Sequence, residues 1–164
     1  MIMQMTYCAK AIGLTICLTS ATLNAAEVID KVTLQKKLNS IGAKQMVSPH
    51  VLMAIIATTS KMHIDYVEMS DKPTKSMVGL MGISCGLAMK HDKTLTHDNC
   101  VEKLKNPDVS IGLGNAILFS YGTTCEQDAK CIFEKWFGEK STAKVNQAYG
   151  AYTLSVLLNT PTKK

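Results

Sequence analysis

Apolar residues recur at helical spacing in several separate segments of the chain. After Val51, the apolar residues and Thr59 fall at offsets of one, four, five and eight positions, which is one face of a buried helix. Ser48 and Pro49 precede this run, and serine at the N-cap followed by proline is a typical helix start. The pattern therefore predicts a buried helix that begins at Pro49 and ends near Ser60.

Other segments with helical periodicity are bounded by residues that start or stop helices, such as the Asn106–Pro107 pair and the glycines at 42, 122 and 138. The predicted helices are Glu27 to Leu38, Asp108 to Tyr121, Ala129 to Phe137 and a last helix that Ser141 caps. Their expected inward positions are Val28, Val32 and Leu38 in the first, Val109, Leu113, Ala116, Ile117 and Ser120 in the second, and Val145, Tyr149, Tyr152 and Val156 in the last.

The middle of the chain is less regular. His63 to Ser76 is polar and contains Pro73, so it is expected to be a loop, whereas the apolar, glycine-rich run Met77 to Met89 predicts a short, closely packed helix. No segment alternates apolar and polar residues for long, and neither repeats nor linkers are visible. The sequence predicts one all-α domain of about six helices.

The first 26 residues resemble a secretory signal. Lys10 is the only charge before Glu27, and the apolar run Ala11 to Leu18 is followed by small residues suited to cleavage. The run is too short for a transmembrane helix, which needs about 20 apolar residues. We expect a signal peptide over residues 1–26, a mature domain over residues 27–164, and a periplasmic or secreted protein without a transmembrane segment.

Four cysteines remain after removal of the signal peptide: Cys85, Cys100, Cys125 and Cys131. An even number in an exported protein favours disulfides, and four cysteines allow three pairings. The two local closures, Cys85–Cys100 and Cys125–Cys131, are favoured. A zinc site of Cys85, His91, His97 and Cys100 is the alternative, but closed zinc sites usually show tighter pairs, so no metal is expected.

The mature domain carries 17 lysines and no arginine against 13 acidic residues, a formal charge of +4. Without arginine there is no bidentate recognition of phosphate or carboxylate, and no basic cluster supports nucleic-acid binding. A mildly basic exported protein suits an anionic partner such as cell wall or a membrane surface. Most of the ten methionines are expected to fill the core, the alternative being an adaptable apolar groove for a partner.

Five segments occur in the order found in a known family: AIIATTS (Ala54 to Ser60), GLMGI (Gly79 to Ile83), NPDVSIGLGNAILFSY (Asn106 to Tyr121), CIFEKWFG (Cys131 to Gly138) and YTLSVLL (Tyr152 to Leu158). Together they resemble the lysozyme-like domain of soluble lytic transglycosylases. The resemblance covers Val47 to Leu158 and implies a lysozyme-like domain whose relatives cleave the glycan strand of peptidoglycan without a cofactor.

The chain departs from the family where the chemistry is done. Thr59, followed by the matching Ser60, stands where the resemblance implies the catalytic glutamate, and Gly82 replaces the glutamine of the Gly-Leu-Met-Gln motif. Lys135 and Trp136 replace a Tyr-Asn pair. The resemblance therefore makes Thr59, Ser60, Met81, Gly82, Lys135 and Trp136 candidate groove residues.

The family glutamate protonates the leaving glycosidic oxygen and then accepts a proton from the attacking 6-hydroxyl. A threonine hydroxyl cannot do this at neutral pH, and loss of the acid costs on the order of 10²–10⁴ in rate. The sequence thus predicts a catalytically inactive pseudoenzyme that binds peptidoglycan or a protein of an envelope-spanning assembly such as a secretion system. The alternative is an active lytic transglycosylase that uses a displaced acid, Glu68, with Asp65 and Asp71 as further candidates.

Overall fold

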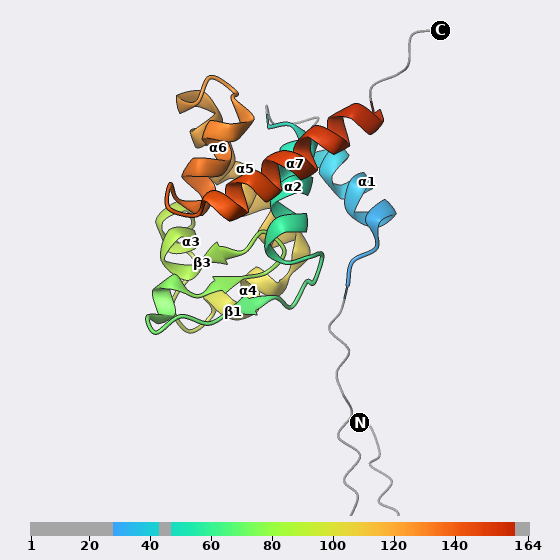
Figure 1. Ribbon diagram of the computed structural model, residues 1–164. Coiled ribbons are helices and arrows are strands. Elements are labelled where there is room, and N and C mark those ends of the chain that lie inside the picture. Colours follow the sequence, from blue (N-terminus) through green and yellow to red (C-terminus); the bar gives the residue numbers. More distant parts are fainter. Residues whose placement is uncertain (1–27, 43–46, 160–164) are drawn as a thin grey trace, which may run out of the picture.

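The computed structural model describes residues 28–42 and 47–159 (Figure 1), so the expected signal peptide at residues 1–26 lies outside the described residues. Within these ranges the chain forms seven α-helices, one short 3-10 helix and three two-residue strands. Their order is α1 (Lys31–Gly42), α2 (Pro49–Thr59), β1 (Val67–Glu68), η1 (Pro73–Lys75), β2 (Met77–Val78), β3 (Ile83–Ser84), α3 (Cys85–His91), α4 (Cys100–Lys105), α5 (Pro107–Thr124), α6 (Ala129–Phe137) and α7 (Thr142–Asn159).

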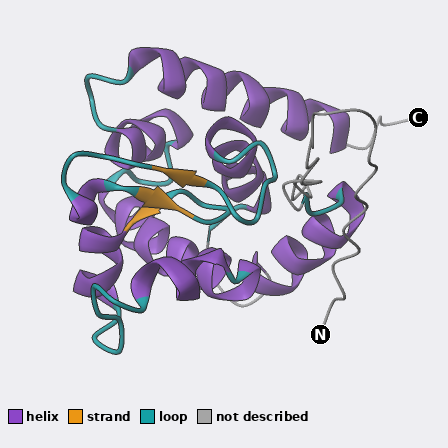
Figure 2. Ribbon diagram, turned by 90° about the horizontal axis from the view of Figure 1, so that it is seen from below, coloured by secondary structure: helices purple, strands orange, loops and turns teal. Residues whose placement is uncertain are grey.

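The helical prediction is confirmed in its main part, but the chain is not purely α-helical. The three strands form an antiparallel sheet in the order β1-β2-β3, seen in orange among the helices in Figure 2. The register pairs Val67 with Val78 and Met77 with Ser84. The short helix predicted from Met77 is wrong before Cys85, because Gly79 and Gly82 have positive φ angles and turn the chain between β2 and β3.

Helix α2 matches its prediction and lies at the centre of the helices. The Ser48 hydroxyl accepts a hydrogen bond from the His50 amide at the start of α2, and α2 ends at Thr59. Nearly all of its residues are buried, with Leu52, Ile55 and Ile56 fully so. Helices α1 and α7 both pack against it (Figure 1). No helix in the described ranges is long and apolar enough to span a membrane.

Helix α1 begins later than predicted, because the Asp30 carboxylate accepts hydrogen bonds from the Val32 and Thr33 amides and caps the helix there. Its buried residues are Leu34 and Leu38. The predicted inward positions at Val28 and Val32 are wrong, since Val28 is 54% exposed and Val32 is 64% exposed.

Helix α5 starts at the predicted cap but turns a different face to the core. Its buried residues are Ser110, Ile111, Gly114, Asn115, Ile117, Leu118 and Gly122, whereas the predicted Ala116 and Ser120 are exposed. Apolar residues lie on several sides of α5, so periodicity did not single out one face. The buried face is the one that contains Gly114, where the absence of a side chain lets Met81 pack closely: a Cβ there would lie 2.8 Å from Met81 Cγ. Gly122 does not end the helix, which continues to Thr124.

The last two helices lie where they were predicted, but the inward face predicted for α7 is only partly correct. Helix α6 runs from Ala129 to Phe137 and ends at Gly138 as predicted. In α7, Val145 is buried as expected, but Tyr149 is 44% exposed and the buried neighbour is Ala148. Two disulfides, Cys85–Cys100 and Cys125–Cys131, join the cysteines in the favoured pairs.

Candidate functional site

Three of the five segments that resemble the transglycosylase family meet at one point in the core. Thr59 is the last residue of α2, and its methyl group packs directly on the backbone of Gly82. A Cβ at Gly82 would lie 2.0 Å from Thr59 Cγ2, closer than any real contact. The space that a side chain at position 82 would occupy is therefore filled by the Thr59 methyl group.

The turn that contains Gly82 is also fixed to α5. The Met81 amide donates a hydrogen bond of 3.0 Å to the Ser110 hydroxyl. At the other end of the turn, a Cβ on Gly79 would lie 1.9 Å from the Leu104 carbonyl oxygen. The GLMGI segment is thus held between the end of α2 on one side and the end of α4 with the start of α5 on the other.

Four of the candidate groove residues lie in the interior of the protein. Thr59 is 8% exposed, Ser60 1% and Met81 0%, and Gly82 is also buried. Their placement leaves little polar surface at this point with which a sugar could make contact. Thr59 packs on Gly82, and Ser60 and Met81 are their neighbours in the chain.

The hydroxyl groups at the end of α2 are held differently from one another. Ser60 Oγ donates to the Ile56 carbonyl and accepts from the Met62 amide. The Thr58 and Thr59 hydroxyls are buried and have no hydrogen-bond partner among the described residues. A threonine hydroxyl in such surroundings is neither an acid nor a base near neutral pH.

Lys135 and Trp136 are neighbours on α6 but differ in their surroundings. The Lys135 side chain is exposed, whereas Trp136 is half-buried and packs against the core with Phe137. The indole Nε1 of Trp136 is buried without a hydrogen-bond partner in the described chain. Trp136 therefore lies at the edge of the core.

Glu68, the candidate displaced acid, lies on β1 and is held by two neighbours. Its carboxylate accepts a hydrogen bond of 2.5 Å from the Tyr66 hydroxyl and one of 3.4 Å from Lys144 Nζ on α7. The Tyr66 hydrogen bond, assisted by the charge of Lys144, lowers the pKa of the Glu68 carboxyl despite partial burial. A general acid for glycosidic cleavage needs a raised pKa, so Glu68 is tuned in the opposite direction.

The Glu68 contacts predict a pH-dependent contribution to stability. Because the pKa of the Glu68 carboxyl in the folded protein lies below its ordinary value, the stabilisation is present above the ordinary value and is lost as pH falls through the folded-state pKa. Since the side chain is 51% exposed, we expect Glu68→Gln to cost at most about 1 kcal/mol at pH 7. Thermal unfolding of both proteins at pH 7 and pH 3 measures this, and a cost that persists unchanged at pH 3 contradicts the assignment.

The proposed zinc ligands do not form a metal site in the described chain. Cys85 and Cys100 are joined in a disulfide and cannot ligate a metal, and His91 and His97 have exposed side chains. No group of three or more histidine, cysteine, aspartate or glutamate side chains that could hold a metal occurs in the described residues. His50, which was not among the proposed ligands, forms a hydrogen bond of 2.8 Å through Nδ1 with the Ser155 hydroxyl, and this bond joins α2 to α7.

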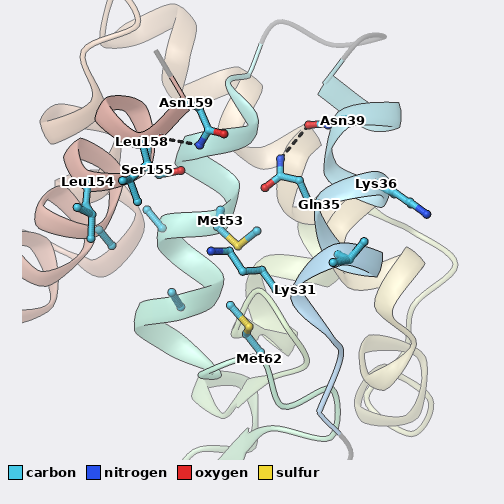
Figure 3. A pocket seen from close by; sticks show the side chains of 14 residues that line it. Lys31, Gln35, Lys36, Asn39, Met53, Met62, Leu154, Ser155, Leu158 and Asn159 are labelled. Atoms are coloured by element: carbon cyan, nitrogen blue, oxygen red, sulfur yellow. Dashed lines mark hydrogen bonds between the residues drawn. The ribbon is translucent and has the colours of Figure 1, made fainter. Parts of the chain in front are cut away.

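The structure also contains a groove, lined in part by two of the methionines for which an adaptable apolar groove was the alternative interpretation. It has a volume of about 540 Å³ and lies between α1, α2 and the last turns of α7 (Figure 3). Its lining is mostly apolar and includes Met53, Met62, Leu154 and Leu158. The signal in the sequence was the leucine-rich end of α7, whose leucines fall outside the predicted inward positions.

Comparisons of the chain with models of protein families, with curated proteins and with solved structures found no match.

Proposed function

We propose that this chain is an exported, non-catalytic protein with a lysozyme-like domain of the lytic transglycosylase type, which acts by binding a protein of an envelope-spanning assembly. The observation that carries the proposal is the packing of the Thr59 methyl group on Gly82. At the position where the resemblance implies the acid, a buried threonine fills the space that the family's glutamine side chain would need.

The resemblance gains support from the way its segments meet. Segments that are far apart in the sequence contact one another through Thr59, Gly82, Met81 and Ser110. The last two segments also meet, since the Phe133 and Tyr152 rings contact edge to face with centroids 6.2 Å apart.

Export is supported by the two disulfides, because disulfides persist in oxidising compartments outside the cytosol. The signal-like character of residues 1–26 agrees with this proposal.

Loss of catalysis is supported by the chemistry of the described carboxylates. The reaction needs a carboxyl group whose pKa is raised toward the working pH and which is held on a rigid support. Glu68 is exposed and accepts hydrogen bonds from Tyr66 and Lys144, and its pKa is lowered. Asp65 and Asp71 are exposed on the same loop region.

A protein partner is favoured over a glycan by where polar and apolar groups lie. The candidate glycan-contacting residues Thr59, Ser60 and Met81 are buried. Large apolar side chains are instead exposed on α7, with Leu154, Leu157 and Leu158 at 58%, 67% and 73% exposure. Exposed apolar groups that gather beside a groove are typical of protein-binding surfaces.

Sedimentation with insoluble peptidoglycan tests the choice between protein and glycan. We expect only charge-driven binding, which decreases steeply as ionic strength rises from about 0.01 M to about 1 M and the Debye length falls from about 30 Å to about 3 Å. The bound fraction in the pellet is measured at each salt concentration, with a lysozyme-type glycan-binding protein as the control. Binding that is unchanged at the highest salt contradicts the proposal, because it requires a specific glycan site.

A further inference from the structure

The groove between α1, α2 and α7 has the shape of a binding site for one more helix. Figure 3 shows α2 as its floor, with α1 on one side and α7 on the other. Small side chains keep the middle open, since Ala54 and Ala57 on α2 and Ala151 on α7 line it. Because all three elements are helices, the hollow between them matches the shape of a helix packed along them.

The walls of the groove carry apolar side chains that nothing in the described chain covers. Leu154 and Leu158 lie one turn apart on α7 and are 58% and 73% exposed, and Val32 on α1 is 64% exposed. The floor adds Met53 and Met62, whose flexible side chains adapt to different apolar partners. The groove therefore offers apolar contacts at the i, i+4 spacing of a helix.

The charged side chains that line the groove are all positive. Lys31 and Lys36 line it, and no aspartate or glutamate does. Figure 3 shows Lys31 extending across the groove beside Met53 and Met62, and neither lysine forms an ion pair within the described residues. An occupant that places carboxylates beside its apolar face would pair with these cations.

We propose that the groove binds an amphipathic helix of a partner protein, which has leucine-like residues along one face and aspartate or glutamate residues beside that face. The inference rests on the proposed function, a protein that acts by binding rather than by catalysis. The apolar face packs on Met53 and Ala57 between the leucines of α7 and Val32, and the acidic residues lie near Lys31 and Lys36.

Other occupants fit the groove less well. A second copy of the chain would bring the Lys31 and Lys36 side chains of two protomers toward one another, which is unfavourable. The sequence at positions 160–164, Thr-Pro-Thr-Lys-Lys, carries no acidic residue to meet the lysines. A lipid surface is flat on this scale and leaves the hollow of about 540 Å³ unfilled.

The test is a selection from a displayed library of 18-residue peptides against the exported protein, followed by fluorescence anisotropy of the enriched peptide. The expected peptide is amphipathic and acidic. Leu158→Gln should weaken its binding about 10- to 100-fold, since one leucine contact is lost, and Lys31→Glu should weaken it roughly threefold to tenfold.

Leu157→Gln is the matched control, because Leu157 is 67% exposed on the same turn but does not line the groove. It should leave the affinity unchanged. The proposal is overturned if no peptide is enriched, if the enriched peptides are basic, or if both leucine variants have the same effect.

Two further measurements decide between the proposed helix and the other occupants. Leu158-dependent binding to vesicles of phosphatidylglycerol, or a dimer in analytical ultracentrifugation that Leu158→Gln abolishes, would each assign the groove to a different occupant and overturn the proposal. Peptide binding is independent of peptidoglycan cleavage, so failure here is distinct from failure of the non-catalytic proposal.

Discussion

Replacing Gly82 with alanine is expected to destabilise the protein by about 2–6 kcal/mol, a large part of the 5–15 kcal/mol that holds a typical domain together. Two effects add. Gly82 has φ +58°, a conformation that side-chain-bearing residues rarely adopt, and the new Cβ would lie 2.0 Å from Thr59 Cγ2 in a buried region. Urea unfolding of the wild type and the variant measures the change.

The steric part of this cost should depend on the methyl group of Thr59. In the Thr59→Ser background Cγ2 is absent, and the nearest remaining side-chain atom is the Cβ of residue 59, at 3.2 Å. We therefore expect Gly82→Ala to cost about 1–3 kcal/mol less in that background, measured as a double-mutant cycle.

Gly138→Ala is the matched control for this cycle, since Gly138 also has a positive φ but a Cβ there meets no atom within 4 Å. Its cost should be the same with threonine or serine at position 59. Equal costs for Gly82→Ala in the two backgrounds would show that Thr59 and Gly82 do not share one space.

Removing the Cys85–Cys100 disulfide is the second large effect, with an expected loss of about 3 kcal/mol. The bond joins the first residue of α3 to the first residue of α4 across a sequence separation of 15, and both cysteines are buried. Without it the unfolded chain gains conformational entropy. The paired substitution Cys85→Ala with Cys100→Ala, compared with the wild type by urea unfolding, measures the loss.

The Cys125–Cys131 bond supplies the internal comparison. It closes a separation of only 6 residues, so its paired alanine variant is expected to lose about 2 kcal/mol. Each variant replaces two cysteines with alanine, so the two differ mainly in the length of chain that the disulfide closes. A larger loss from the shorter closure would contradict the entropic account.

The sequence predicted the helices that local signals define. Ser48 and Pro49 start α2, Asn106 and Pro107 start α5, and Gly138 ends α6. These signals are local, because serine and asparagine cap a helix through side-chain hydrogen bonds, and proline and glycine act through their backbone geometry. The three two-residue strands were not predictable from alternation, since a strand of that length shows no pattern. They depend on the turns at Gly79 and Gly82 and on pairing with β1.

Inward faces were harder to predict than helix bounds. In α5 the choice of face depends on the close approach of Gly114 to Met81, which lies in a different segment. In α1 the cap at Asp30 moves the start of the helix, and Val32 faces the open groove. The groove itself follows from the relative placement of α1, α2 and α7, which no single segment encodes.

The candidate site shows the same division. The sequence identified Thr59 and Gly82 as departures from the family pattern, but it gave no sign that they contact each other. Their contact shows that the two residues are structurally linked, because a glycine at position 82 makes room for the threonine methyl group. In the structure the two residues form one packed unit of the core.

The most direct test of the non-catalytic account is mass spectrometry of the soluble products released from purified peptidoglycan by the protein. We predict no anhydro-muropeptides from the wild type or from Glu68→Gln, under conditions in which an active lytic transglycosylase releases them. Anhydro-muropeptides from the wild type that disappear with Glu68→Gln would contradict the account and make Glu68 the displaced acid.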